Sequence, residues 1–486
     1  MSSSPTHSPG DAAQQSTTHE SARGGLRPGR LGAIAIIFFV VAAVAPMAAI
    51  VGASPIVFSA NGVTAPLVYL LAALLFAVFS VGYVAMSRHI TNAGGFVAYI
   101  ARGLGVRAAT AAAGLAILAY TALQAALWSQ FSVFAQQLLS DKLGVDVPRW
   151  ILMFGCLAVV TALTVIGVDV SLRVLGALVA LEIAAFVVLD IAIIISSGGA
   201  DGNSLAGFNP TDLAGPGLGV AFLFCITCFT GFEATVVFSE EAKNPRRTIP
   251  RAVYGSIAFI GIFYALTTWA LGNSVGADNV QAAATNDPAG FVFAIATAEV
   301  GPWLTTTMQV LVVTSFLAML IGFQNMFARY LFALGRAGVL PRQLGHAHPV
   351  RATPAVAAAS IGIALAVILA VFELAGADPI TVTFSWLLSL GTVSLIVILI
   401  LTSISIITFF ARTKLETKTW TTLIAPSIAT LGFGLVIYLA LTNYDALLGG
   451  DGATAEWLLL LIPAFAIAGF AWPSVRRHIN YQAELV

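Results

Sequence analysis

Long uninterrupted apolar blocks, separated by short polar segments, dominate the pattern along the chain. Examples are Leu31–Phe58, Ala65–Met86 and Ile380–Phe410. An α-helix rises about 1.5 Å per residue, so roughly 20 apolar residues cross the hydrocarbon core of a membrane. The blocks predict about twelve membrane-spanning helices, at residues 31–59, 65–87, 106–139, 148–168, 171–196, 216–239, 251–272, 303–335, 354–375, 380–411, 420–441 and 455–473.

The composition supports this interpretation and excludes other classes of protein. Hydrophobic residues make up 59% of the 486 positions and charged residues 9%, against about 25% charged in a typical soluble protein. A soluble chain of this size needs a polar surface that such a composition does not provide. The net charge of zero offers no basic surface to nucleic acid. The sequence predicts an all-α polytopic membrane protein.

The charged residues are divided unevenly between the two sides of the expected membrane. If the N-terminus is cytoplasmic and the spans alternate, nearly every Lys and Arg falls on the cytoplasmic side, with Lys142 and Arg149 as the exceptions. The outer loops carry acids instead, among them Asp201, Asp278 and Asp451. This asymmetry follows the positive-inside rule and predicts a multi-pass protein of the cell membrane with both termini cytoplasmic.

The N-terminal segment and the cysteines add little chemistry. Residues 1–30 are rich in Ser, Thr, Gly and Pro and lack an apolar run, so they predict a disordered cytoplasmic tail rather than a signal peptide. All three cysteines lie in apolar spans, so no disulfide framework is expected. Cys225 and Cys228 form a C-x-x-C pattern, which on an apolar helix favours small packing residues over metal or redox chemistry.

Two of the expected spans contain residues that interrupt a helix near the middle of the membrane. The first span carries Ala45-Pro46-Met47-Ala48-Ala49, and the sixth carries Thr227-Cys228-Phe229-Thr230-Gly231-Phe232-Glu233. Proline removes an intrahelical hydrogen bond and glycine loosens the helix. The first and sixth spans hold matching positions in two halves of five spans, which is typical of inverted-repeat transporters with a midplane substrate site. The alternative is a pair of packing kinks.

At these residues the chain resembles the amino acid–polyamine–organocation permease superfamily. The similar segments are Gly231-Phe232-Glu233, Ser239–Ala252, Asn92–Gly95 with Tyr99, and Arg329–Pro341, while Ala45-Pro46-Met47 is similar to bacterial putrescine importers. The resemblance implies a LeuT-like fold: a five-plus-five inverted repeat at residues 31–412 with broken helices 1 and 6, two further helices at 413–475, and a cytoplasmic tail at 476–486. Ala48-Ala49-Ile50 stands where many members carry G-S-G.

Thr91–Tyr99, between the second and third spans, predicts a turn that leads into a short amphipathic helix on the cytoplasmic side.

An amino acid carries a carboxylate and an ammonium group, and a midplane site must satisfy both without water. The start of a half-helix offers free N–H groups to the carboxylate, and the end of another offers free carbonyls to the amine. We expect N–H groups from Ala48, Ala49 and Ile50. The remaining candidate substrate-binding residues beside the breaks are Ala45, Pro46 and Met47 in the first span and Thr227, Thr230, Gly231 and Phe232 in the sixth. Close helix packing is the alternative role for such small residues.

Acidic side chains inside spans are costly unless they are functional or neutralised. Glu233 follows the sixth-span break and Glu182 lies in the middle of the fifth span. Either is a candidate for coupling or gating; the alternatives are a helix cap for Glu233 and a permanently protonated, hydrogen-bonded acid for Glu182. The resemblance places Glu182 where several relatives have a lysine that stands in for sodium. Asp190 lies near the outer end of the same span, and we expect no special functional role for it.

Other candidates lie on the third and eighth spans. Tyr120, Gln124 and Trp128 recur at i, i+4 and i+8, so they share a helix face that lines either the pocket or a packing contact. Phe323 is a further candidate gate in the eighth span, and Phe232 is a candidate gate in the sixth. Thr314 with Ser315 is a weak signal for sodium binding, because such hydroxyls often bond back to their own helix.

The sequence predicts a secondary active transporter that imports an amino acid or a polyamine-like amine by alternating access, with the proton as the coupling ion. An exchanger is the nearest alternative. A transporter-like amino acid sensor would be expected to have a sizeable cytoplasmic domain, and an ion channel would be expected to have a repeated filter or rings of acids. No enzyme activity, metal or cofactor is expected, because the spans lack a nucleophile–base pair or a metal-ligand cluster. Membrane lipid is the expected surrounding partner.

Overall fold

The computed structural model describes residues 32–90, 95–168, 172–196, 202–232, 235, 243–349, 351, 353–442 and 456–475. Within these ranges the chain is almost entirely helical and contains no strand. The principal helices are α1 (Ala33–Val44), α2 (Pro46–Asn61), α3 (Ala65–Ser87), α4 (Gly95–Leu104), α5 (Val106–Leu143), α6 (Arg149–Ile166), α7 (Leu172–Ile195), α8 (Leu218–Thr227), α10 (Pro245–Val275), α11 (Val280–Asn286), α12 (Phe291–Glu299), α13 (Pro302–Arg336), α14 (Ala355–Leu374), α15 (Ser385–Thr413), α16 (Ala425–Thr442), α18 (Glu456–Leu459) and α19 (Leu461–Val475).

The long helices follow the order of the expected spans. Ten stretches of the described chain are long and apolar enough to cross a membrane. One of them, Pro46–Ser87, has 42 residues and contains both α2 and α3, which a short 3₁₀ turn at Gly62–Thr64 separates. The shorter apolar helices α1 and α8 supply further parts of the first and sixth spans. The chain is therefore a multi-pass helical membrane protein.

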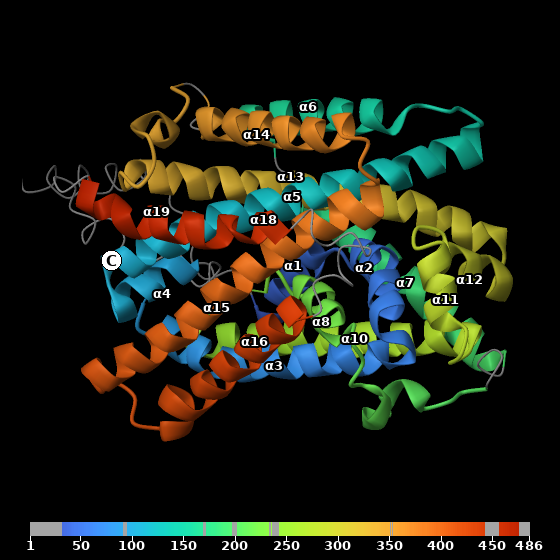
Figure 1. Ribbon diagram of the computed structural model, residues 1–486, viewed down its shortest axis with the longest axis horizontal. Coiled ribbons are helices and arrows are strands. Elements are labelled where there is room, and N and C mark those ends of the chain that lie inside the picture. Colours follow the sequence, from blue (N-terminus) through green and yellow to red (C-terminus); the bar gives the residue numbers. More distant parts are fainter. Residues whose placement is uncertain are drawn as a thin grey trace, which may run out of the picture.

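The helices pair with an offset of five spans. α2 of the first span packs on α8 of the sixth, and α3 of the second packs on α10 of the seventh. α5 of the third packs on α13 of the eighth, and α6 of the fourth packs on α14 of the ninth. Figure 1 shows α6 and α14 side by side at one edge, with α1, α2 and α8 near the centre. This pairing fits a LeuT-like fold built from two related halves.

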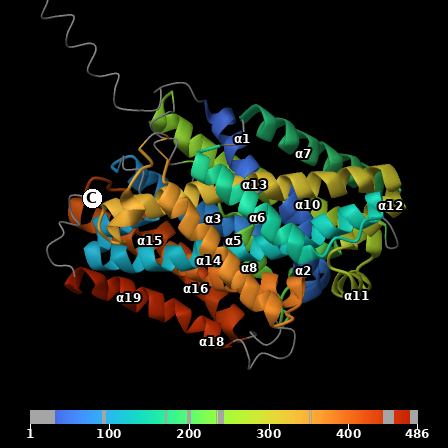
Figure 2. The same ribbon diagram turned by 90° about the horizontal axis from the view of Figure 1, so that it is seen from above.

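The two last helices pack against the outside of this arrangement. α16 contacts α3, α8 and α15, whereas α19 lies along α5 (Figures 1 and 2). Gly114 of α5 and Gly469 of α19 allow this close approach, because a Cβ atom at Gly114 would meet the backbone oxygen of Phe465 and one at Gly469 would meet the backbone of Thr110. Small residues of this kind bring membrane helices into contact through their backbones.

The segment between the second and third spans forms a helix, as expected, but α4 is buried. Residues 96–101 of this helix are all buried, and α4 packs against both α5 and α15. Arg102 is exposed at its end. The apolar face of this amphipathic helix therefore packs against protein. Residues 91–94, which precede α4, lie outside the described part of the chain, as do the tails at 1–31 and 476–486.

Candidate functional site

The first span is interrupted at Ala45. This residue has φ 51° and ψ 77°, in the left-handed region, which a residue with a Cβ adopts at a cost of about 1–2 kcal/mol. α1 ends before it at Val44, and α2 begins after it at Pro46. Proline suits the first position of a helix because its missing N–H has no partner there and its φ is already helical. The expected break in the first span is confirmed.

The start of α2 at Pro46 decides which N–H groups are available. Pro46 has none, so the first-turn N–H groups that lack a partner within the helix belong to Met47 and Ala48. The Ala49 N–H already donates to the Ala45 carbonyl at 3.0 Å. We expected donors at Ala48, Ala49 and Ile50. Of these, only the Ala48 N–H lacks a partner within the helix, because α2 begins at Pro46, which is earlier in the sequence than we expected.

The second break follows α8, which ends at Thr227. Residues 228–232 continue as turns, and Gly231 has φ 112°, a conformation that favours glycine. A Cβ atom built on Gly231 would lie 3.7 Å from the Cβ of Ala43 and 3.8 Å from Cγ2 of Val44. The two breaks therefore meet. Glu233, the expected coupling acid of this span, lies outside the described residues.

Hydroxyl groups at the second break connect it to the tenth span. The Thr227 hydroxyl donates to the Leu223 carbonyl of its own helix at 2.9 Å and also pairs with the Thr392 hydroxyl on α15. The Thr230 hydroxyl is buried and has no hydrogen-bond partner among the described residues. Thr392 was missed by the sequence reasoning, since nothing in the pattern of α15 distinguishes it from other hydroxyls that bond back to their own helix.

Glu182 reaches the first break from α7. Its side chain is 2% exposed, and its Oε2 accepts a hydrogen bond from the Met47 N–H at 3.0 Å. The Ser315 hydroxyl of α13 lies beside the same carboxyl. The fifth-span acid and the first-span break, 135 residues apart, thus form one site.

Two further side chains, Tyr264 and Tyr69, lie in this region and were not singled out from the sequence as site residues. Tyr264 of α10 lies near both Glu182 and Cys228, and its hydroxyl is buried without a partner in the described part of the chain. Tyr69 of α3 packs on Tyr264 with ring centroids 5.6 Å apart, and its hydroxyl lies 3.9 Å from the Cys228 Sγ. A buried tyrosine in an apolar span carries no distinctive sequence signal, so only the fold identifies this group.

Tyr120, Gln124 and Phe323 meet in a contact between α5 and α13. The ring of Tyr120 lies 5.6 Å from that of Phe323, edge to face, and 5.8 Å from that of Phe327. Gln124 donates to Gln324 at 3.4 Å, and Gln324 donates to Thr161 of α6 at 2.9 Å. The predicted face exists, and these contacts make it a packing surface. A role in lining a pocket stays a prediction.

Phe232 is 1% exposed and packs into aromatic side chains of α3. Its ring centroid lies 5.0 Å from that of Phe76 and 6.0 Å from those of Phe79 and Tyr83. In this arrangement the ring points into the helix packing, because the turn at Gly231 directs the chain toward α3. Its role as a gate remains a prediction.

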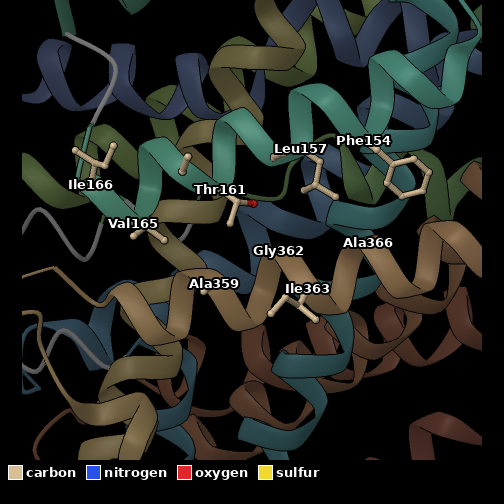
Figure 3. A pocket seen from close by; sticks show the side chains of 11 residues that line it. Phe154, Leu157, Thr161, Val165, Ile166, Ala359, Gly362, Ile363 and Ala366 are labelled. Carbon is tan, nitrogen blue, oxygen red and sulfur yellow. The ribbon is translucent and has the colours of Figure 1, made fainter.

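A surface groove lies away from both breaks. It is a groove of about 660 Å³ between α6 and α14, and Figure 3 shows its almost wholly apolar lining, with Thr161 as the polar exception among the labelled side chains. Exposed apolar residues on both helices, such as Val159 and Val367, indicate a lipid-facing surface. By contrast, the break residues Ala45, Met47 and Ala48 are less than 10% exposed, so the site is closed in this arrangement.

Comparison with known proteins places these features in a family. A family model described as amino acid permease matches residues 35–472. Cationic amino acid transporter 7, chloroplastic, of Arabidopsis thaliana is 26% identical over 308 residues, which are 59% of this chain and 51% of that protein. The branched-chain amino acid permease BcaP of Lactococcus lactis is 29% identical over 303 residues, 57% of this chain and 62% of that protein. The low-affinity putrescine importer PlaP of Escherichia coli is 30% identical over 186 residues, 37% of this chain and 38% of that protein.

Proposed function

The chain belongs to the amino acid permease family, and from this premise we propose that it imports an amino acid or a related amine across the cell membrane by alternating access, in symport with protons. The observation that carries the proposal is the meeting of the two helix breaks, with Gly231 beside Ala43 and Val44. Broken helices that meet in this way present unpaired backbone groups to a substrate. An enzyme is excluded by the family.

The backbone supplies the recognition groups of the proposed site. The Met47 and Ala48 N–H groups at the start of α2 face the substrate carboxylate with the positive end of a helix dipole. Carbonyls near Ala45, Pro46, Thr227 and Thr230 accept from the ammonium. Break residues such as Ala45, Ala48 and Ala49 have small apolar side chains, which suits a site that binds through its backbone.

Two acids are the proposed coupling groups. Glu182 is buried at the first break and hydrogen-bonded to the Met47 N–H, so a change in its charge acts directly on the half-helix that holds the substrate. Glu233 follows the second break in the sequence and is the proposed gating acid. Ionisable groups inside a membrane commonly mark proton or substrate pathways.

The names of the relatives define the substrates to be tried first. They describe transport of cationic amino acids, of branched-chain amino acids and of putrescine. These share an amino group, while side-chain charge and the carboxylate differ. We therefore propose an amino group as the common element of recognition.

Uptake into proteoliposomes tests the proposal. The purified protein is reconstituted, and uptake of the standard amino acids, putrescine and agmatine is measured with and without an inward proton gradient. Uptake that the gradient stimulates is the expected result. Uptake that requires preloaded internal substrate and ignores the gradient would identify an exchanger. Binding without flux would contradict transport and favour a sensor.

A further inference from the structure

The Met47 N–H has two possible acceptors in the transport cycle. We propose that Glu182 and the carboxylate of the substrate compete for this donor, so that a carboxylate-bearing substrate binds only when Glu182 carries a proton. The inference rests on the proposed function and goes beyond it by naming the atoms at which proton and substrate meet. It also predicts opposite pH dependences for amino acids and for the amines formed by removing their carboxylates.

The geometry of the half-helix limits the donors to two. α2 starts at Pro46, which has no N–H, and the Ala49 N–H is bonded to the Ala45 carbonyl. Only Met47 and Ala48 remain to bind an anion in the first turn. Oε2 of Glu182 already lies 3.0 Å from the Met47 nitrogen. A substrate carboxylate that uses both donors must displace it.

The surroundings of Glu182 contain little to neutralise a second negative charge. α7 packs against α1, α2, α10, α12 and α13. From these helices the carboxyl meets the Met47 N–H and the Ser315 hydroxyl, and the Tyr264 hydroxyl is a titratable group near it. No Lys or Arg forms an ion pair with it in the described part of the chain.

The other acids on these helices are engaged elsewhere. Asp190 of α7 accepts from Thr267, and Glu299 of α12 accepts from Ser196 and Ser274. If ionised Glu182 and the substrate carboxylate both lay at the Met47 N–H, they would repel each other in this medium of low dielectric constant.

A proton on Glu182 removes this conflict. The neutral acid no longer competes for the positive end of α2, and its new O–H needs an acceptor. Ser315 provides one, because its hydroxyl lies beside the carboxyl and the residue is only 3% exposed. The proton and the substrate carboxylate therefore bind together, as symport requires. An amine without a carboxylate leaves the Met47 N–H to Glu182 and is attracted by its negative charge.

Equilibrium binding measured between about pH 5 and about pH 8 distinguishes substrates that bind to protonated Glu182 from those that bind to ionised Glu182. The probes are three pairs of an amino acid and its decarboxylated amine: arginine with agmatine, ornithine with putrescine, and leucine with 3-methylbutylamine. The α-carboxyl group stays ionised across this range. For the amino acid that the transporter accepts, the apparent dissociation constant rises with pH and approaches about tenfold per pH unit for one linked proton. The amine that binds does so more weakly at low pH.

Two variants locate the effect on Glu182. Glu182→Gln keeps the shape and removes the charge, so amino acid binding persists and loses its pH dependence. Asp190→Asn removes a partly buried acid on the same helix that accepts a hydrogen bond from Thr267, and this variant keeps the wild-type pH dependence. Elution as a single symmetric species on size-exclusion chromatography verifies that each variant is folded.

Several results would overturn the inference and leave transport intact. These are amino acid binding that is independent of pH in the wild type, the same pH dependence in Glu182→Gln, or binding of amines with no binding of their parent amino acids. If no probe binds or is taken up, the proposed function itself fails, and the inference fails with it.

Discussion

Residues with unusual backbone conformations form the two helix breaks, and the two breaks lie next to each other. Ala45 adopts a left-handed conformation although it has a Cβ atom, and Pro46 then restarts the helix. Gly231, with φ 112°, turns the sixth span beside Ala43 and Val44. Backbone strain of this kind persists only where the surrounding structure holds it.

Replacement of Gly231 tests the conformational requirement at this scale. A Cβ atom there would have ordinary contacts of 3.7 and 3.8 Å, so the cost of Gly231→Ala is conformational, about 1–2 kcal/mol. We expect a lower melting temperature in detergent and reduced uptake. Gly434→Ala is the matched control, because a Cβ at Gly434 in α16 meets nothing within 4 Å. Equal stability of the two variants would contradict the assigned turn.

At the scale of helices, contacts between small or hydroxyl residues hold the elements that flank the site. α4 is fixed between α5 and α15 by Gly103, where a Cβ atom would overlap the backbone of Ser405. α8 is fixed to α15 by the Thr227 and Thr392 hydroxyls. Because both contacts involve α15, this helix connects the sixth span with the helix that follows the second.

Gly103→Ala tests the packing of α4. The added methyl group has no space and must push α4 away from α15, which we expect to cost about 1–3 kcal/mol. The melting temperature of the purified protein should fall accordingly. Gly155→Ala on exposed α6, where a Cβ meets nothing within 4 Å, should leave it unchanged. A stable Gly103→Ala variant would show that α4 is not held in this position.

A double-mutant cycle tests the hydroxyl pair. Thr392→Val and Thr227→Val each remove one hydroxyl at nearly constant volume, and their effects on the free energy of unfolding should be coupled by about 0.6 kcal/mol, a typical value for a hydrogen bond between membrane helices. Thr402→Val, which loses only a bond to its own helix, should show no coupling with Thr227→Val. Additive effects of the first pair would rule out the contact.

For the molecule as a whole, local signals in the sequence predict a large part of the fold. Apolar length predicts the spans, and Ala45-Pro46 predicts the first break because proline acts on its own helix. The Glu182–Met47 hydrogen bond joins residues 135 apart, and side-chain partners at such separations depend on how whole helices pack. For the same reason the burial of α4 and the direction of Phe232 were not predictable, whereas the mid-span position of Glu182 marked it as unusual.

The orientation in the membrane is a prediction at this scale that rests on the charge distribution. Single cysteines are introduced by Val145→Cys, after α5, and Thr419→Cys, before α16, both at exposed positions. The native Cys225 and Cys228 are buried, and Cys156 is removed by Cys156→Ala. An impermeant maleimide should label Val145→Cys in intact cells and Thr419→Cys only after lysis. The opposite pattern would reverse the assigned sides.

The most direct test of the central claim is the ratio of proton flux to substrate flux. Proteoliposomes that contain a pH-sensitive dye report proton entry while labelled substrate is taken up from the outside. The wild type should move about one proton with each amino acid, and Glu182→Gln should lose proton movement that depends on the amino acid. Substrate entry with no accompanying proton, or proton entry that persists unchanged in Glu182→Gln, would contradict a symporter whose coupling group is Glu182.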